Sequence, residues 1–112
     1  MLRENESAEI LARNGYNIEQ NPKVPGTREP DYIIEGEIFD CYSPEPNTKV
    51  RGIWSNIFNK VVEKKQTERV IINLNDWLGN VDDIVNNLKD YPIDGLKEVI
   101  VIKEDNVISI YP

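Results

Sequence analysis

Two aspartates, Asp31 and Asp40, are the side chains of this sequence best suited to chemistry. Asp31 directly precedes, and Asp40 lies within, a short stretch rich in β-branched and aromatic residues, residues 32–34 and 38–42 respectively. Gly36 lies between the two stretches, where a tight turn needs a positive φ. An aspartate at the start of one strand and another inside the next can meet across the pair. Two carboxylates brought together in a partly buried place must share a proton, bind a cation or pair with Lys or Arg.

Glu4 and Lys60 are the two further polar residues that we expect around the same point. Glu4 lies one turn before Ala8 on the apolar stripe of an expected helix over residues 4–14, so that it can point inward, whereas Glu6 on the same helix is expected to point outward. Lys60 lies at the border of the apolar face of the next expected helix, residues 50–65. The more common roles stay open for both, a surface glutamate that complements the helix dipole and a lysine that reaches solvent.

These four residues form a complete set for cleaving a phosphodiester. Two or three carboxylates make a hard oxygen-ligand site for Mg²⁺ or Mn²⁺, or a borderline site for Zn²⁺. Such a metal can activate a water and stabilise charge on a phosphate oxygen, and a nearby lysine can neutralise the transition state. The sequence therefore predicts a metal-dependent nuclease site.

Composition narrows the alternatives. The chain of 112 residues has no histidine and one cysteine, Cys41, which excludes histidine-based catalysis, an internal disulfide and a cysteine-based zinc cluster. Cys41 is expected to be a small core residue on its strand. The net charge of −7 argues against a broad basic face for nucleic acid. No apolar run approaches a membrane span, and the N-terminus does not resemble a secretory signal.

The order of the expected elements indicates a single α/β domain over residues 1–112. A helix over residues 4–14 ends at Gly15 and precedes a strand at 16–19, a loop at 20–30 and the two strands that carry the aspartates. The helix at 50–65, a buried strand at 69–74, a helix at 81–89 and a strand pair at 98–102 and 107–111 follow. We expect a mixed sheet flanked by helices, with a C-terminal strand pair.

Weaker candidates for substrate contact lie around the long helix. Five cations, Lys49, Arg51, Lys64, Lys65 and Arg69, could form a local patch that positions phosphates, or a solvated flank. Gln66 and Thr67 could line the cleft, and Tyr42 shares the face of Asp40 by strand alternation. Trp54 and Trp77 could stack a base; Trp54 lies on the apolar stripe and is expected in the core, whereas the position of Trp77 is open.

The Pro30-Asp31 pair followed by an acid inside the next strand, within a helix, three strands, a helix and a strand, resembles the PD-(D/E)XK nuclease superfamily. This chain departs from the usual motif, because Tyr42 and not lysine follows two positions after Asp40. The resemblance includes members in which the lysine comes from the following helix, and Lys60 fits that variant.

A closer resemblance covers nearly the whole chain. The segments at residues 4–12, 15–22, 29–44, 51–61, 66–77 and 92–102 are similar to the C-terminal toxin domain of contact-dependent growth inhibition proteins, in the Burkholderia-type tRNase group. The resemblance implies a metal-dependent endoribonuclease that cuts tRNA in the cytoplasm of a neighbouring bacterium. It also implies a parent protein that is very large, secreted and cell-surface, and a cognate immunity protein that neutralises the toxin. The family's acidic cluster and lysine fall on Glu4, Asp31, Asp40 and Lys60.

Two other functions compete with this one. A metal-free, barnase-like (BECR-type) tRNase toxin would use Lys, Arg, Tyr and Asp directly as acids and bases. A non-catalytic binding or immunity-type module would share the acidic charge, but it would not need the four residues in one cleft. The same acidic charge raises the question of whether a host RNA-binding factor assists tRNA binding.

Overall fold

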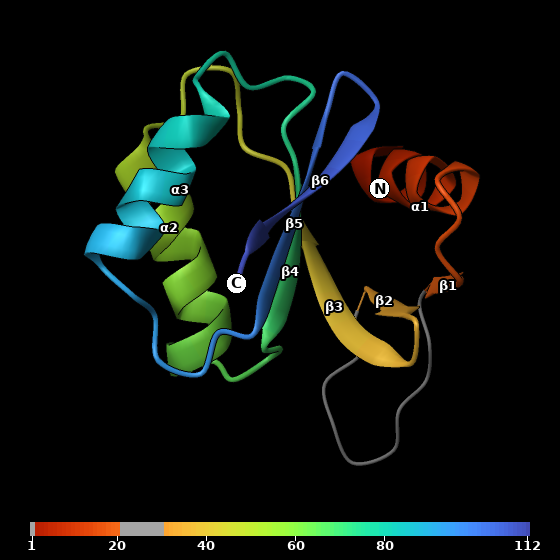
Figure 1. The fold of residues 1–112 in the computed structure, drawn as a ribbon, viewed down its shortest axis with the longest axis horizontal. Coiled ribbons are helices and arrows are strands. Elements are labelled where there is room, and N and C mark those ends of the chain that lie inside the picture. Colours follow the sequence, from red (N-terminus) through yellow and green to blue (C-terminus); the bar gives the residue numbers. More distant parts are fainter. Residues whose placement is uncertain (1, 21–30) are drawn as a thin grey trace.

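A computed structural model describes residues 2–20 and 31–112, with side chains from residue 5 onward. Within these ranges the chain forms one six-stranded sheet in sequential order, and helices cover both of its faces (Figure 1). The strands are β1 (Ile18–Gln20), β2 (Tyr32–Ile34), β3 (Glu37–Tyr42), β4 (Arg69–Asn73), β5 (Glu98–Lys103) and β6 (Asn106–Tyr111). The helices are α1 (Leu2–Arg13), α2 (Val50–Phe58) and α3 (Val81–Asp90), with a π-helical segment η1 (Asn59–Glu63) directly after α2.

The sheet is mixed, and its parallel centre explains where the helices lie. Strands β3, β4 and β5 run parallel, so the chain must cross back between them, first through α2 and η1 and then through α3. Strand pairs β1–β2, β2–β3 and β5–β6 are antiparallel. The predicted α/β architecture, with a mixed sheet, flanking helices and a C-terminal strand pair, is confirmed.

Two apolar clusters divide the core by face. The helices α2 and α3 pack on one face through a cluster that includes Ile53, Val70 and Leu88. Helix α1 packs on the other face through a cluster that includes Leu11, Phe39 and Ile71. In Figure 1 the sheet is seen nearly edge-on, with α2 and α3 to its left and α1 to its right. No helix of the described segments is long and apolar enough to cross a membrane.

Glycine and positive-φ residues close the turns as the sequence predicts. Helix α1 ends in a Schellman arrangement, in which Gly15 has φ +91° and Tyr16 N–H donates to the Leu11 carbonyl over 3.1 Å. Glu35 and Gly36, with φ values of 50° and 82°, form the two-residue turn between β2 and β3. Strand β1 begins at Ile18, two residues later than expected, because Tyr16 still belongs to this helix end. The loop expected at 20–30 falls, from residue 21 on, outside the described residues.

The predicted helix over residues 50–65 is not a single α-helix. It ends at Phe58 and continues as the wider π-helix η1, in which Lys64 N–H donates to the Asn59 carbonyl over 2.8 Å. Lys65, with φ 51°, then turns the chain, and Gln66 N–H donates to the Lys60 carbonyl over 2.8 Å. The change from α-helical to π-helical spacing is not accompanied by a change in the types of apolar residue, so the hydrophobic periodicity of the sequence did not reveal it.

Trp54 is less buried than its position on the apolar stripe predicts, and Trp77, whose position the sequence left open, lies in the core. Trp54 is only partly buried; its ring stacks on Phe58 with centroids 5.1 Å apart, and its Nε1–H donates to the Tyr91 carbonyl over 2.8 Å. Trp77 is the core residue, 2% exposed, and donates to the Thr48 carbonyl over 2.6 Å. Burial leaves no face of Trp77 available for stacking on a base.

Candidate active site

Asp31 and Asp40 lie side by side across the β2–β3 pair. Tyr32 pairs with Phe39, so the residue before Tyr32 adjoins the residue after Phe39. Asp31 N–H donates to Oδ1 of Asp40 over 3.3 Å, and Cys41 N–H donates to Oδ2 of Asp31 over 2.8 Å. Each aspartate is thus held by the backbone of the other strand. The hairpin fixes both carboxylates relative to one another, as the strand pattern predicts.

Asp40 is the buried member of the pair. It is 3% exposed and points to the face of the sheet that α2 and η1 cover. Burial raises its pKa above the ordinary 3.8, and the neighbouring charge of Asp31 raises it further, whereas the ammonium of Lys60 lowers it. A bound cation would stabilise the ionised form of a buried carboxylate that lies beside a second carboxylate.

Lys60 and Gln66 approach the same oxygen of Asp40. Lys60 Nζ lies 3.8 Å from Oδ2, and the Gln66 side-chain amide donates to Oδ2 over 3.2 Å. The π-helix η1 carries Lys60, and the bond from Gln66 N–H to the Lys60 carbonyl holds the two residues together. This segment therefore delivers a cation and an amide to one carboxylate oxygen, and π-helical turns occur frequently at functional sites.

Glu4 lies in α1, but its side chain, like Pro30, falls outside the described residues. Among the described side chains, no group of three or more histidines, cysteines or carboxylates is placed to hold a metal ion. The part of the predicted cluster that the structure brings together is Asp31, Asp40 and Lys60.

Helix α1 is attached to the sheet by a polar network that the sequence did not reveal. Asn73, 1% exposed at the end of β4, donates its amide to Glu6 Oε1 over 3.1 Å and to Ser7 Oγ over 2.9 Å. Asn75 also donates to Glu6 Oε1, over 3.0 Å. The expectation that Glu6 points away from the sheet is therefore wrong, because two amides at the end of β4 give its carboxylate partners.

Cys41 connects this network to the aspartates. It is partly buried and packs against the α1 side of the core, where its Sγ lies 3.6 Å from Ser7 Oγ. Its backbone N–H holds Asp31. The strand alternation that places Asp40 on the α2 face places Cys41 on the α1 face, so β3 links both sides of the site.

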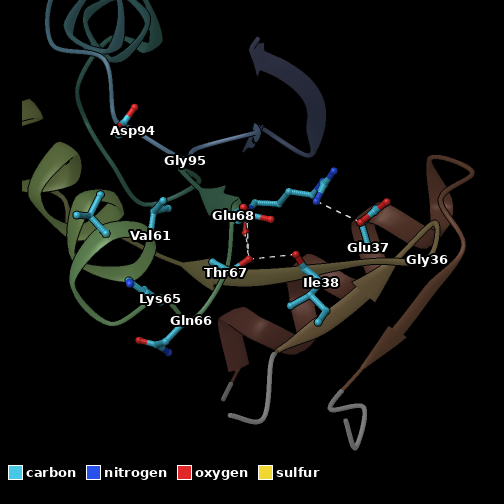
Figure 2. A pocket seen from close by; sticks show the side chains of 12 residues that line it. Gly36, Glu37, Ile38, Val61, Lys65, Gln66, Thr67, Glu68, Asp94 and Gly95 are labelled. Atoms are coloured by element: carbon cyan, nitrogen blue, oxygen red, sulfur yellow. Dashed lines mark hydrogen bonds and ion pairs between the residues drawn. The ribbon is translucent and has the colours of Figure 1, made fainter. Parts of the chain in front are cut away.

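The candidates for substrate contact divide between two places. Gln66, Thr67 and Arg69 line an open pocket of about 900 Å³ (Figure 2), and Gln66 also bonds Asp40. Arg51 lies instead in a smaller groove of about 310 Å³ between α2 and α3, with Trp54 and Tyr91. The five expected cations are thus spread over both ends of the long helical segment, and Arg69 is paired with Glu37 at 3.1 Å and Glu98 at 3.4 Å.

Thr67 and Tyr42 have identifiable structural contacts. The Thr67 hydroxyl is placed between the carbonyls of Ile38 and Arg69, at 3.0 and 2.7 Å, and accepts from Arg69 N–H over 3.0 Å. It thereby joins the start of β4 to β3. Tyr42 is partly buried against the α2 side of the core, and burial raises the pKa of its phenol. Substrate contact by either residue stays a prediction.

The chain is similar in sequence to a known protein family and to a curated protein. The family model of the contact-dependent growth inhibition CdiA C-terminal domain matches residues 28–108. A curated relative, tRNA nuclease CdiA-2 of Burkholderia pseudomallei (strain 1026b), is 42% identical over 113 residues, which cover 100% of this chain and 4% of that protein.

A solved structure agrees with the sequence match. It is described as the CdiA-CT/CdiI toxin and immunity complex from Burkholderia pseudomallei, and it superposes with a TM-score of 0.89 at 42% identity, over 99% of this chain and 83% of that chain. The identity, the fold and the family match all point the same way. This chain belongs to the contact-dependent growth inhibition CdiA C-terminal domain family.

Proposed function

We propose that this chain is a metal-dependent endoribonuclease toxin of PD-(D/E)XK type that cleaves tRNA in the cytoplasm of target bacteria. The observation that carries the proposal is the convergence of Asp31, Asp40 and Lys60 at one point of the sheet. The relative named tRNA nuclease CdiA-2 supports the reaction and the substrate. Lys60 reaches Asp40 from the segment after β3, which supports the variant PD-(D/E)XK arrangement in spite of Tyr42.

The donor set of the site fits a hard divalent cation. Mg²⁺ is commonly held by one or two carboxylates together with substrate phosphate oxygens and water, and Asp31 and Asp40 provide such a pair. We assign these two residues, with Glu4 from α1, as ligands for Mg²⁺, Mn²⁺ or Zn²⁺. The cation would supply Lewis acidity at the scissile phosphate.

The residues of the chain have separate tasks in this mechanism. Backbone N–H groups of Cys41 and Asp31 orient the two carboxylates before substrate arrives. Lys60, whose side chain is 18% exposed, donates from its ammonium to a phosphate oxygen and stabilises the charge that develops there. Gln66 holds Oδ2 of Asp40, so that the carboxylate keeps one orientation during the reaction.

We further propose that a cognate immunity protein neutralises the domain and that the domain belongs to a large secreted CdiA protein. The solved toxin and immunity complex and the small share of the curated relative that this chain spans support these two points. The net charge of −7 repels tRNA at a distance, which motivates a search for a basic RNA-binding factor in the target cell.

Incubation of the purified domain with total bacterial tRNA tests the proposal. We expect discrete cleavage that stops with EDTA, returns with Mg²⁺, Mn²⁺ or Zn²⁺, and is absent in Asp31→Ala and Lys60→Ala. Asp90→Ala, an exposed site on α3, is the matched control and should cleave normally. Cleavage that persists in EDTA would replace the metal mechanism with a metal-free, barnase-like one. Absence of cleavage, with or without target-cell extract, would leave a non-catalytic binding module.

A further inference from the structure

The open pocket of about 900 Å³ adjoins Asp40 through two of the residues that line it, Ile38 and Gln66. Ile38 lines it and lies two positions before Asp40, so both side chains occupy the same face of β3. Gln66 also lines it and donates to Oδ2 of Asp40. A polynucleotide with its phosphate at the aspartates would therefore place an adjoining nucleoside in this pocket.

The charges of the pocket do not suit a second phosphate. Its lining includes the cations of Lys65 and Arg69 but also the carboxylates of Glu37, Glu68 and Asp94. Arg69 is neutralised by Glu37 and Glu98, and Glu68 pairs with Lys97 at 3.3 Å. Phosphate sites use cations that are available to the anion. This pocket offers a neutral ligand better recognition than it offers a phosphate.

The arrangement of the lining matches the parts of a nucleoside. Val61, Val62 and Ile38 give an apolar surface for the face of a base. In Figure 2, Lys65 and Gln66 lie together on one side and Asp94 with Gly95 on another. Among the described residues, no ion pair involves Lys65 or Asp94, so each is available to a ligand.

Asp94 offers a hydrogen-bond acceptor that selects among bases. It lies in a turn closed by Leu96 N–H donating to the Ile93 carbonyl over 3.2 Å, and Gly95, with φ +87°, follows it. Carboxylates accept hydrogen bonds from exocyclic amino groups, as Asp and Glu do from cytosine N4. Adenine, cytosine and guanine carry such a group, whereas uracil presents carbonyl oxygens in its place.

We propose that this pocket is the subsite for the nucleoside next to the scissile phosphate, and that it selects a base with an exocyclic amino group. Lys65, which lies beside Gln66, contacts the scissile phosphate. Asp94 accepts a hydrogen bond from the exocyclic amino group of the base. The inference rests on the proposed nuclease function, since the aspartates must hold the neighbouring phosphate.

A binding experiment tests the subsite independently of cleavage. Each of the four ribonucleoside 5′-monophosphates is titrated into the ¹⁵N-labelled domain while amide chemical shifts are followed. We expect AMP, CMP and GMP to shift the amides of Ile38, Gln66 and Gly95 and to bind about tenfold more tightly than UMP. Asp94→Asn should remove the difference between UMP and the other three, and Lys65→Ala should weaken all four alike. Asp90→Asn and Lys89→Ala, on the surface of α3, are the matched controls.

The outcomes separate this inference from the function on which it rests. Shifts that avoid the pocket, or a preference for UMP, or base selection that survives in Asp94→Asn, would overturn the subsite even if the domain cleaves tRNA. Nucleotide binding with the expected selection in a domain that never cleaves tRNA would keep the pocket as a nucleotide site and would refute the nuclease.

Discussion

The side-chain amide of Gln66 donates to Oδ2 of Asp40 over 3.2 Å, the same oxygen that Lys60 Nζ approaches to 3.8 Å. In the proposed mechanism Gln66 takes no part in the chemical step; it orients the Asp40 carboxylate, which we assign to the metal site. Residues that orient metal ligands typically change activity by about 10- to 100-fold, and this is the role that we propose for Gln66.

Gln66→Ala is therefore expected to lower kcat for tRNA cleavage by about 10- to 100-fold with little change in KM. Loss of a donor to the charged carboxylate disfavours the ionised form, so the acid limb of the pH–rate profile should move to higher pH. Gln20→Ala is the matched control, because the Gln20 amide bonds Asn5 on the α1 side of the sheet. An increase in KM alone would make Gln66 a substrate contact and not a positioning residue.

The raised pKa of Asp40 predicts that the stability of the folded protein depends on pH. Its folded-state pKa is raised above 3.8 by burial, then by Asp31, against the effect of Lys60. The folded protein therefore binds this proton more tightly than the unfolded chain, and the free energy of unfolding falls as pH rises from about 3.8 through the folded-state pKa.

Asp40→Asn removes this cost and should be inactive but more stable than the wild type at neutral pH. The Gln66 amide can reverse and present its oxygen to the new NH₂ group, and the partly exposed Lys60 can turn its ammonium to solvent. Urea unfolding at about pH 7 and about pH 4 checks this, and the difference between variant and wild type should shrink at the lower pH. A variant that is less stable than the wild type at both pH values would show that the bonds to Asp40 outweigh its burial.

Two glycines give opposite expectations for the same substitution. A Cβ at Gly79 would lie 2.2 Å from the Trp77 ring, which is buried and cannot retreat, so Gly79→Ala should destabilise the fold by about 1–3 kcal/mol. A Cβ at Gly52 would meet only the Thr48 methyl at 3.3 Å, and alanine is more favourable than glycine in a helix by about 0.5–1 kcal/mol. Gly52→Ala should therefore stabilise the fold. Thermal unfolding of the two variants checks the contrast. Equal melting temperatures would mean that Trp77 moves aside.

How far the sequence predicts this site depends on the kind of contact. Asp31 and Asp40 were placed correctly because the strand period of two and the turn at Gly36 determine which residues face one another. The elements that carry them were predicted to within a few residues for the same reason. Lys60 was found from a border position on a helix, although the π-helical turn that orients it leaves no trace in the apolar pattern.

The contacts that were missed are polar and long-range. Asn73 and Glu6 are 67 positions apart, and neither residue type indicates that one will bind the other. Trp54 was expected in the core from its position on an apolar stripe and Trp77 was left open, whereas the groove between α2 and α3 and the loop after β4 determine their burial. Tertiary contacts of this kind depend on how whole elements pack together, and the local periodicity of the sequence carries no information about that packing.

Asn73 offers the last prediction, because it joins α1 to the end of β4, the strand beside β3. Its amide donates to Glu6 and Ser7, and its oxygen accepts from Asn75 N–H over 3.0 Å. Asn73→Ala removes these bonds from the buried Ser7 and the partly buried Glu6, and should lower the free energy of unfolding by about 1–3 kcal/mol.

The loss should concentrate in α1, so hydrogen exchange of the amides of residues 8–12 is expected to accelerate more than that of β4. Activity should fall as well, because α1 carries Glu4, which we assign to the metal site. Asn87→Ala is the matched control: the Asn87 side-chain oxygen is buried on α3 with no hydrogen-bond partner in the described part of the chain, so its removal should cost little and leave activity unchanged. Uniform acceleration of exchange across the whole sheet in Asn73→Ala would instead make Asn73 a general core residue, with no particular role in placing α1.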